Sequence, residues 1–237
     1  MRVLVTRSRP DAENTADALV ARGHSVVVSP LLIVTMEESS EVNFDGVQAI
    51  LITSTNGARA LARLTARRDV PVFAVGSASA ESVRGFGFAE IENAEGDVEA
   101  LAALVVEHLA PDAGRLVHVA GTVTAGDLSE LLYASGFLVE RAVAYRADAA
   151  AQMPAKIEEG LRGGKLDAAL FFSPRTASQF VDLIDRAGLR SECCKVIAAA
   201  LSPAVAERLA PLKFADVRIA KLPNQESLFL ALENGSI

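Results

Sequence analysis

The amino-acid sequence predicts an α/β protein with two doubly wound parallel-sheet domains, joined by a two-stranded β linker, of which domain one is discontinuous. Three observations support this prediction. Short apolar runs alternate with helical patterns, a strand–turn–helix corner occurs twice, and two other strand–helix segments are also duplicated. The chain has 237 residues, 51% of them apolar, which is enough for two domains with separate cores.

Six short runs are apolar or β-branched almost throughout, as buried parallel strands should be. They are RVLVT from residue 2, AILIT from 49, VFAV from 72, LVHVA from 116, AALFF from 168 and VIAAA from 196. Helical patterns follow them. One begins after Pro10 and ends at Gly23, and another begins near Asp127 and ends at Gly136, because glycine commonly follows the last helical turn. We expect Tyr133, on the apolar side of the second helix, to lie in the core.

Three kinds of segment each occur twice along the chain. The corner QAILITSTNGA overlays DAALFFSPRTA without a gap, so that Ser54 falls on Ser173. The segment VFAVGSASAESV overlays AAALSPAVAERL, with Gly76 on Ser202. The third alignment places RLVHVAGTVTAGDLSELLYASGFLVE over RVLVTRSRPDAENTADALVARGHSVV, with Gly136 on Gly23.

The order of these segments leaves a tandem or a nested arrangement open, and short connections favour the nested one. We therefore predict that residues 1–34 and 150–237 form domain one, and that residues 38–142 form an inserted domain two. The chain would cross at 34–38 and at 142–150, where the two crossings pair as the linker. An open cleft between the domains is expected.

Composition excludes several classes of function. The net charge of −7, two tyrosines and no tryptophan disfavour nucleic-acid binding. The three histidines are scattered, and the only cysteines, Cys193 and Cys194, are adjacent, so no metal-ligand spacing is present. Two half-buried thiols before a strand are favoured over a vicinal disulfide. The start MRVLVTRSRP resembles no signal peptide, and no apolar run reaches the roughly 18 residues of a membrane span. We expect a cytoplasmic protein.

Small and polar residues follow the strands, where ligands bind in open α/β sheets. These strand ends are TSTNG (53–57), GSAS (76–79), AGTVT (120–124), SPRT (173–176), LSPA (201–204) and TRSRP (6–10). Small side chains let a ligand approach the backbone, and helix N-termini attract anions. The same residues also serve as ordinary helix caps. All of these ends but the last, TRSRP, are rich in serine, threonine, glycine and other short side chains. Five such corners facing one cleft favour a large anionic ligand, while the absence of phosphate-loop, dinucleotide and nucleophile-elbow motifs disfavours a nucleotide or a catalytic triad.

Six longer motifs occur in a specific order and spacing, although each is weak alone. They are VLVTRSRPDAENTADALVARGHSVVVSPLL, ILITSTNGARAL, VFAVGSASAESVRGFGF, GDLSELLYASGFLVERAVAYR, ALFFSPRTASQF and LPNQESLFLAL. Together they resemble the uroporphyrinogen-III synthase family over essentially the whole chain. The resemblance implies two α/β domains, the first discontinuous, joined by a β-ladder.

The resemblance also implies an enzyme, a cyclising hydro-lyase of porphyrin and heme biosynthesis that uses no metal or cofactor. Such enzymes convert linear hydroxymethylbilane, a tetrapyrrole with eight carboxylates, to uroporphyrinogen III. Loss of water gives an azafulvene on ring A, ring D attacks through its substituted α-carbon, and the resulting spiro intermediate recloses with ring D inverted. Positioning of a flexible chain would dominate catalysis. A non-catalytic or degenerate two-domain protein that binds anions or tetrapyrroles is the alternative, and a monomer is expected.

The resemblance places the family's catalytic tyrosine at Tyr145, where it would assist departure of the hydroxyl group as a proton or hydrogen-bond donor. The alternative is an aromatic residue of the linker strand that only packs. Arg7 and Arg146 are candidate carboxylate partners or, equally, solvated charges. By match to the family's motifs, the substrate would contact Thr53, Ser54, Asn56, Gly57, Ser77, Ser79, Gly121, Ser173, Pro174, Thr176 and Ser202.

Three positions depart from the family pattern. The family often has threonine where this chain has Ser79. Ser202 replaces a glycine, a residue that suits a positive φ or a close approach, and Val205 lacks a hydroxyl that the family carries. The last two departures fall in the part of the site that domain one would contribute.

Overall fold

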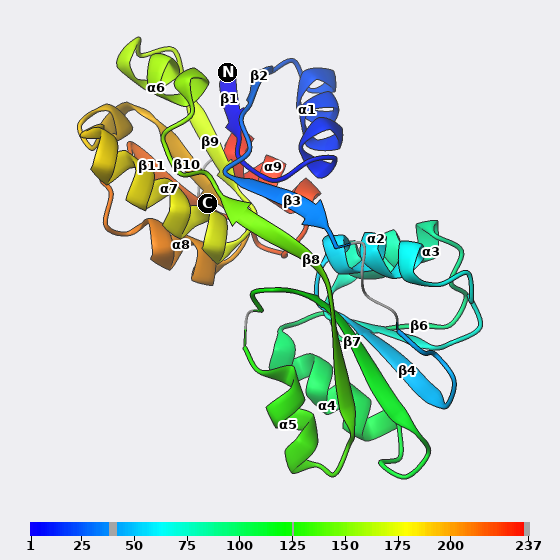
Figure 1. Ribbon diagram of the computed structural model, residues 1–237. Coiled ribbons are helices and arrows are strands. Elements are labelled where there is room, and N and C mark those ends of the chain that lie inside the picture. Colours follow the sequence, from blue (N-terminus) through cyan, green and yellow to red (C-terminus); the bar gives the residue numbers. More distant parts are fainter. Residues whose placement is uncertain (38–41, 125, 235–237) are drawn as a thin grey trace. The chain divides into compact units, whose positions relative to one another are not determined.

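The computed structural model describes residues 1–37, 42–124 and 126–234 (Figure 1). The chain separates into two compact units: unit 1 comprises residues 1–33 and 148–237, and unit 2 comprises residues 34–147. The inserted domain was predicted to begin at residue 38, where the first crossing was predicted to end. This residue lies outside the described residues.

Unit 1 holds a five-stranded parallel sheet in the order β11-β10-β9-β1-β2. Its elements are β1 (Arg2–Val5), α1 (Asp11–Ala21), β2 (Ser25–Val28), α6 (Ala155–Arg162), β9 (Ala168–Phe171), α7 (Pro174–Ala187), the 3-10 helix η1 (Glu192–Lys195), β10 (Ile197–Ala200), α8 (Pro203–Leu209), β11 (Asp216–Ile219) and α9 (Gln225–Asn234). Helices α6, α7 and α8 pack on one face of this sheet, whereas α1 and α9 pack on the other. The arrangement is doubly wound, as predicted.

Unit 2 holds the second sheet, in the order β3-β8-β7-β4-β5-β6. Its elements are β4 (Val47–Ile52), α2 (Thr55–Leu64), β5 (Val72–Ala74), α3 (Ser77–Gly85), β6 (Ile91–Asn93), α4 (Val98–His108), β7 (Arg115–Gly121), α5 (Leu128–Ala134) and most of β8 (Val139–Ala149), with β3 (Leu32–Met36) at its edge. Strands β4 to β8 pair in parallel. Helices α2 and α3 cover one face, and α4 and α5 cover the other.

The chain passes from one unit to the other within β3 and within β8, which is a single long strand (Figure 1). The two strands are neighbours in the sheet. The Glu37 N–H donates to the Ala144 carbonyl at 2.9 Å, and the Ala150 N–H donates to the Leu31 carbonyl at the same distance. From the first hydrogen bond to the second, the residue number falls from 37 to 31 on one side and rises from 144 to 150 on the other. β3 and β8 therefore run antiparallel.

The predicted α/β class with parallel sheets is confirmed, and all six predicted runs form strands, namely β1, β4, β5, β7, β9 and β10. The duplicated segments occupy equivalent places, because β10-β9-β1-β2 in unit 1 corresponds to β5-β4-β7-β8 in unit 2. Gly23 and Gly136, aligned in sequence, both follow a helix with positive φ (83° and 86°).

Two expectations about individual side chains are wrong. Tyr133 is 78% exposed rather than in the core, because α5 buries Leu128 and Leu132 and turns Tyr133 to solvent. The cysteines are not both half-buried. Cys193 is buried and Cys194 exposed, both are free thiols in η1, and burial raises the pKa of Cys193 to about 12.

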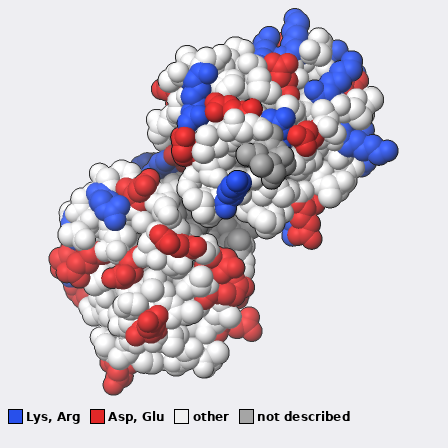
Figure 2. Space-filling view, turned by 180° about the vertical axis from the view of Figure 1, so that it is seen from behind, with Lys and Arg blue, Asp and Glu red and all other residues white. Residues whose placement is uncertain are grey.

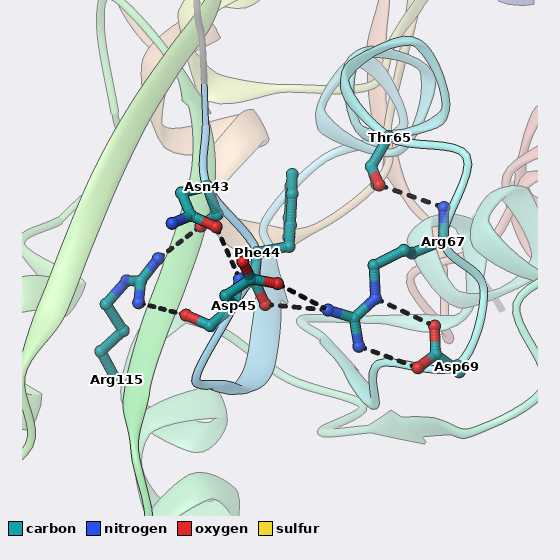
Figure 3. Close-up of polar contacts among 7 residues, drawn as sticks. All are labelled: Asn43, Phe44, Asp45, Thr65, Arg67, Asp69 and Arg115. Carbon is teal, nitrogen blue, oxygen red and sulfur yellow. Dashed lines mark hydrogen bonds and ion pairs between the residues drawn. The ribbon is translucent and has the colours of Figure 1, made fainter.

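Two arginines donate hydrogen bonds to main-chain carbonyls at the amino edge of the sheet in unit 2 (Figure 3). Arg115, the first residue of β7, donates to the main-chain carbonyls of Asn43 and of Asp45, the latter at 2.6 Å. It also pairs with Glu140 of β8 at 3.0 Å. The segment leading into β4 is therefore tied to β7 and β8.

A second arginine holds the same segment from the other side. Arg67 donates to the Phe44 carbonyl at 3.1 Å and forms a two-point ion pair with Asp69 (Figure 3). Carboxylate pairing raises the pKa of Arg67 and lowers that of Asp69. Arg67 and Arg115 therefore stabilise the fold at this edge through ion pairs and hydrogen bonds within unit 2.

Charged side chains of both signs are scattered among large neutral areas on the face in Figure 2, with no continuous basic surface there. Within the described residues, none of the helices combines the length and apolar character that a bilayer crossing demands.

Candidate functional site

The corner after β4 begins the best-defined polar cluster. Ser54 is the N-cap of α2, with extended backbone, and its Oγ accepts the Gly57 N–H at 3.0 Å. The residues that follow form the first turn of α2, and the N-terminus of this helix lies at the carboxyl edge of the sheet. Gly57 is required here, since a Cβ would lie 2.9 Å from the Val119 carbonyl. The corner therefore packs against the backbone of β7.

Tyr145 of β8 reaches this corner. Its hydroxyl lies 2.9 Å from Ser54 Oγ, and either oxygen can donate in that hydrogen bond. The side chain is 8% exposed and packs within the cluster between the sheet and α2. Ser54 thus couples the helix cap of α2 to the tyrosine of a strand two positions away in the sheet.

A β-bulge gives Tyr145 its direction. Ala120 of β7 pairs with Val143, whereas the next residue, Gly121, pairs with Tyr145, so Ala144 is the extra residue of β8. Side chains normally alternate between the faces of a strand, but Ala144 and Tyr145 are both buried in the α2-side cluster. Bulges next to functional sites commonly redirect a side chain in this way.

Gly121 makes room for the ring. A Cβ on this residue would lie 2.7 Å from Cε2 of Tyr145 and 2.9 Å from its Cζ, closer than non-bonded carbons approach. The next residue, Thr122, donates its N–H to the Tyr145 carbonyl at 3.0 Å. Backbone from the end of β7 therefore contacts Tyr145 both at the ring and at the main chain.

Thr53 takes part in a separate pair. Its Oγ1 lies 3.2 Å from Nε2 of His118, a residue of β7 that is only 3% exposed. The pKa of His118 is lowered to about 4, first by burial and then by the positive charge of Arg141, while the negative charge of Asp127 opposes both. The imidazole is therefore neutral near pH 7, and its tautomer decides whether Thr53 donates or accepts.

The other predicted residues of unit 2 lie at the same carboxyl edge but have local roles in the structure. Asn56 Oδ1 accepts from Arg59 at 2.9 Å. Ser77 is exposed and accepts from Asn93 at 3.4 Å, while Ser79 is buried in the first turn of α3. Their contacts with substrate stay a prediction.

In unit 1, the corner after β9 repeats the cap. Ser173 Oγ accepts the Thr176 N–H at 3.2 Å and lies 2.9 Å from its Oγ1, and Pro174 occupies the first turn of α7. Both hydroxyl groups are thus turned towards each other. The corner keeps a local hydrogen-bond pair in which no tyrosine takes part.

The departures at Ser202 and Val205 have clear structural settings. Ser202 caps α8 with extended backbone (φ −155°), as its counterpart Gly76 caps α3 (φ −168°). Nothing lies within 4 Å of a Cβ built on Gly76. Neither position therefore demands glycine. Val205 is buried in the unit 1 core, where its methyl groups pack.

The two arginines differ in setting. Arg7 pairs with Asp11 at 3.0 Å, donates to Thr15 at 3.3 Å and to Gln225 at 3.5 Å, and lies over the Phe172 ring. Its guanidinium thus joins the loop after β1 to α1 and α9 within unit 1.

Arg146 is exposed on β8, next to Tyr145. A role for either arginine in carboxylate binding stays a prediction.

His118 and Arg141 were not selected from the sequence as site residues. A polar residue within the buried run LVHVA was the available signal for His118. For Arg141, no sequence signal separates it from other exposed arginines. In the described part of the chain, no group of three or more histidine, cysteine or acidic residues is arranged to hold a metal ion.

Comparisons with known proteins give a family and a fold. The family model for uroporphyrinogen-III synthase HemD matches residues 13–229. The crystal structure of uroporphyrinogen-III synthetase from Helicobacter pylori is similar with a TM-score of 0.63 at 15% identity, over 98% of this chain and 99% of that chain. A mutant uroporphyrinogen III synthase from Thermus thermophilus gives a TM-score of 0.56 at 19% identity, over 98% and 97%. Among curated proteins, the sequence has no match.

Proposed function

The chain belongs to the uroporphyrinogen-III synthase family of tetrapyrrole biosynthesis, and from this premise we propose that it cyclises hydroxymethylbilane to uroporphyrinogen III. Ring D is inverted through a spiro intermediate. The observation that carries the proposal is the hydrogen bond between Tyr145 and Ser54, which holds a single phenol at the carboxyl edge of a parallel sheet.

Tyr145 is proposed to assist the first step. Ser54 Oγ accepts the Gly57 N–H and lies 2.9 Å from the tyrosine oxygen. In the proposed step Ser54 is the donor of that hydrogen bond, so that the phenol proton is directed at the hydroxymethyl oxygen. The C–O bond then breaks with loss of water, and the pyrrole nitrogen lone pair stabilises the azafulvene cation. The substituted α-carbon of ring D attacks this cation, and the spiro intermediate opens and recloses at the other α-carbon of ring D, which reverses the ring. That carbon then loses its proton, which restores the pyrrole and replaces the proton given by the phenol.

The remaining work is binding and orientation. Residues 34–147 contain 16 acidic and 8 basic residues, a net charge of −8, and no lysine. A substrate with eight carboxylates therefore gains nothing from the overall charge of unit 2 and depends on local donors. We propose that these are main-chain N–H groups and hydroxyls of the corners at Ser54, Ser77 and, in unit 1, Ser173 and Ser202. The proposal includes a monomeric cytoplasmic enzyme that binds no nucleic acid.

The test generates hydroxymethylbilane in situ and resolves the I and III isomers of the product. Without catalysis the bilane closes to the I isomer, so the expected result is a clear excess of III. No excess over the uncatalysed mixture contradicts the cyclase proposal and favours the alternative, a non-catalytic binder of anions or tetrapyrroles.

Tyr145→Phe keeps the ring and removes the hydroxyl. We expect kcat to fall on the order of 100-fold without being abolished, the low end of the effect of one positioned proton donor. Tyr133→Phe is the matched control, since Tyr133 is the only other tyrosine and is 78% exposed. Unchanged turnover in Tyr145→Phe removes this residue from the mechanism.

A further inference from the structure

The end of β7 forms the immediate support of Tyr145. Gly121 packs against the ring, and Thr122 donates its N–H to the tyrosine carbonyl. The peptide unit that joins Gly121 to Thr122 therefore lies against both parts of the residue proposed to act on substrate. Its own placement sets where the phenol points.

Arg141 binds that same peptide segment. Its Nη2 donates to the Gly121 carbonyl at 2.6 Å and to the Thr122 carbonyl at 3.0 Å. Arg141 lies on β8, four residues before Tyr145. In the register of the two strands it is opposite His118 of β7. Two carbonyls that share one guanidinium nitrogen are held in a fixed relative orientation.

The tyrosine and the arginine act from opposite faces of the sheet. Ala142, Ala144 and Tyr145 belong to the α2-side cluster, and Arg141 alternates with them, so it starts on the α5 side. Its guanidinium nevertheless reaches the carbonyls at the end of β7. The strand end is thus held from one face by Arg141 and packed by Tyr145 on the other.

We infer that Arg141 is a positioning residue for Tyr145: it fixes the Gly121–Thr122 peptide, which in turn fixes the tyrosine ring. This inference rests on the proposed role of Tyr145 in cyclisation. It assigns to Arg141 an effect on turnover and not on substrate affinity, because the guanidinium acts through the main chain of β7.

β7, the strand whose carboxyl end Arg141 contacts, offers a matched control at its amino end. Arg115 also donates to two main-chain carbonyls, those of Asn43 and Asp45, but at the amino edge of the sheet (Figure 3). Arg115→Lys and Arg141→Lys therefore make the same chemical change to the same kind of contact. Only the second change adjoins Tyr145.

The kinetic test compares Arg141→Ala, Arg141→Lys and Arg115→Lys with the unaltered protein, by kcat, KM and the ratio of III to I isomer. For Arg141→Ala we expect kcat to fall on the order of tenfold with KM changed less than about twofold, since small misplacement of a reacting group is costly. Arg141→Lys should recover part of the loss, because an ammonium group can reach one carbonyl. Arg115→Lys should leave kcat unchanged.

A spectroscopic test observes Tyr145 directly. The chain has two tyrosines and no tryptophan, so 3-fluorotyrosine labelling gives two ¹⁹F NMR signals. Tyr145→Phe identifies the signal of Tyr145. In Arg141→Ala this signal should shift or broaden while that of the exposed Tyr133 stays in place, and Arg115→Lys should move neither. Thermal unfolding midpoints of all variants show whether folding is retained, and Arg141→Lys serves if Arg141→Ala does not fold.

Three results overturn the inference. An unmoved Tyr145 signal in both Arg141 variants shows that the guanidinium does not position the ring. A raised KM with unchanged kcat shows instead that Arg141 binds a substrate carboxylate. Equal effects of Arg141→Lys and Arg115→Lys show a general loss of stability. If the unaltered protein makes no excess of III isomer, the proposed function fails, while the ¹⁹F signals still decide the structural link.

Discussion

The corner after β4 and the corner after β9 share a sequence pattern, a serine N-cap and a place in equivalent sheets, yet their hydroxyls have different partners. Ser54 meets Tyr145 from another strand, whereas Ser173 meets Thr176 from its own helix. Because both serines are helix N-caps, capping explains the part of the sequence pattern that the two corners share. The long-range partner is what distinguishes unit 2.

The difference extends along β7 and β8. The repeat alignment is also the strand register, since Val3 pairs with Val26 as Leu116 pairs with Val139. Continued along the chain, it places Gly121 over Ser8, His118 over Val5 and Tyr145 over Leu32. Unit 2 thus has a tyrosine, the glycine that admits its ring and a buried histidine where unit 1 has ordinary side chains. One scaffold, used twice, carries its specialised residues in one copy.

The largest expected effect comes from removing the space that Gly121 provides. In Gly121→Ala the new Cβ would lie 2.7 Å from the Tyr145 ring, so the ring must move. We expect kcat for III formation to fall on the order of 10- to 100-fold, the cost of displacing a reacting group by about an ångström. Gly85→Ala is the control, because nothing lies within 4 Å of its Cβ. Full activity of Gly121→Ala would break the link between this glycine and Tyr145.

A second prediction concerns His118, whose counterpart in unit 1 is Val5. Burial holds the pKa of His118 at about 4, whereas an unfolded histidine titrates near 6.5. Between these values the unfolded chain binds the additional proton, so stability from this group is complete above about pH 6.5 and is lost as the pH falls towards 4. The loss amounts to at most about 3 kcal/mol.

His118→Val should therefore flatten the pH dependence of the unfolding free energy between about pH 4 and 6.5, even if it lowers stability at every pH. Urea unfolding at several pH values measures this slope. His108→Gln is the control, as His108 is exposed. Parallel curves for His118→Val and the unaltered protein would show that His118 is not buried in its neutral form.

The strands and the duplication were predictable because each leaves a pattern that can be read directly in the sequence. Strands covered by helices on both faces are apolar along most of their length, and all six predicted runs are apolar or β-branched almost throughout. The edge strands β6 and β11 were not predicted, since the sequences IEN and DVRI lack that pattern. Tyr133 was misplaced because α5 has only seven residues, too few to show which face is buried.

The candidate site was predictable only in part. The serine corners follow from cap chemistry at strand ends, and the structure places caps at Ser54 and Ser173. The contact of Tyr145 with Ser54 depends on a bulge at Ala144, a matter of pairing between strands that single-chain periodicity does not report. Arg141 has the same origin, since its partners are carbonyls, which every sequence contains.

The smallest expected effects test the comparison most sharply. Ser54→Ala and Ser173→Ala each remove an N-cap, and each should lower the unfolding free energy by about 1 kcal/mol. Only Ser54→Ala also removes the partner of Tyr145, so it should lower kcat several-fold. Ser173→Ala should act on KM instead, through the proposed carboxylate contact. If both variants lower kcat alike, the two corners are catalytically equivalent, and the tyrosine contact is not what separates unit 2 from unit 1.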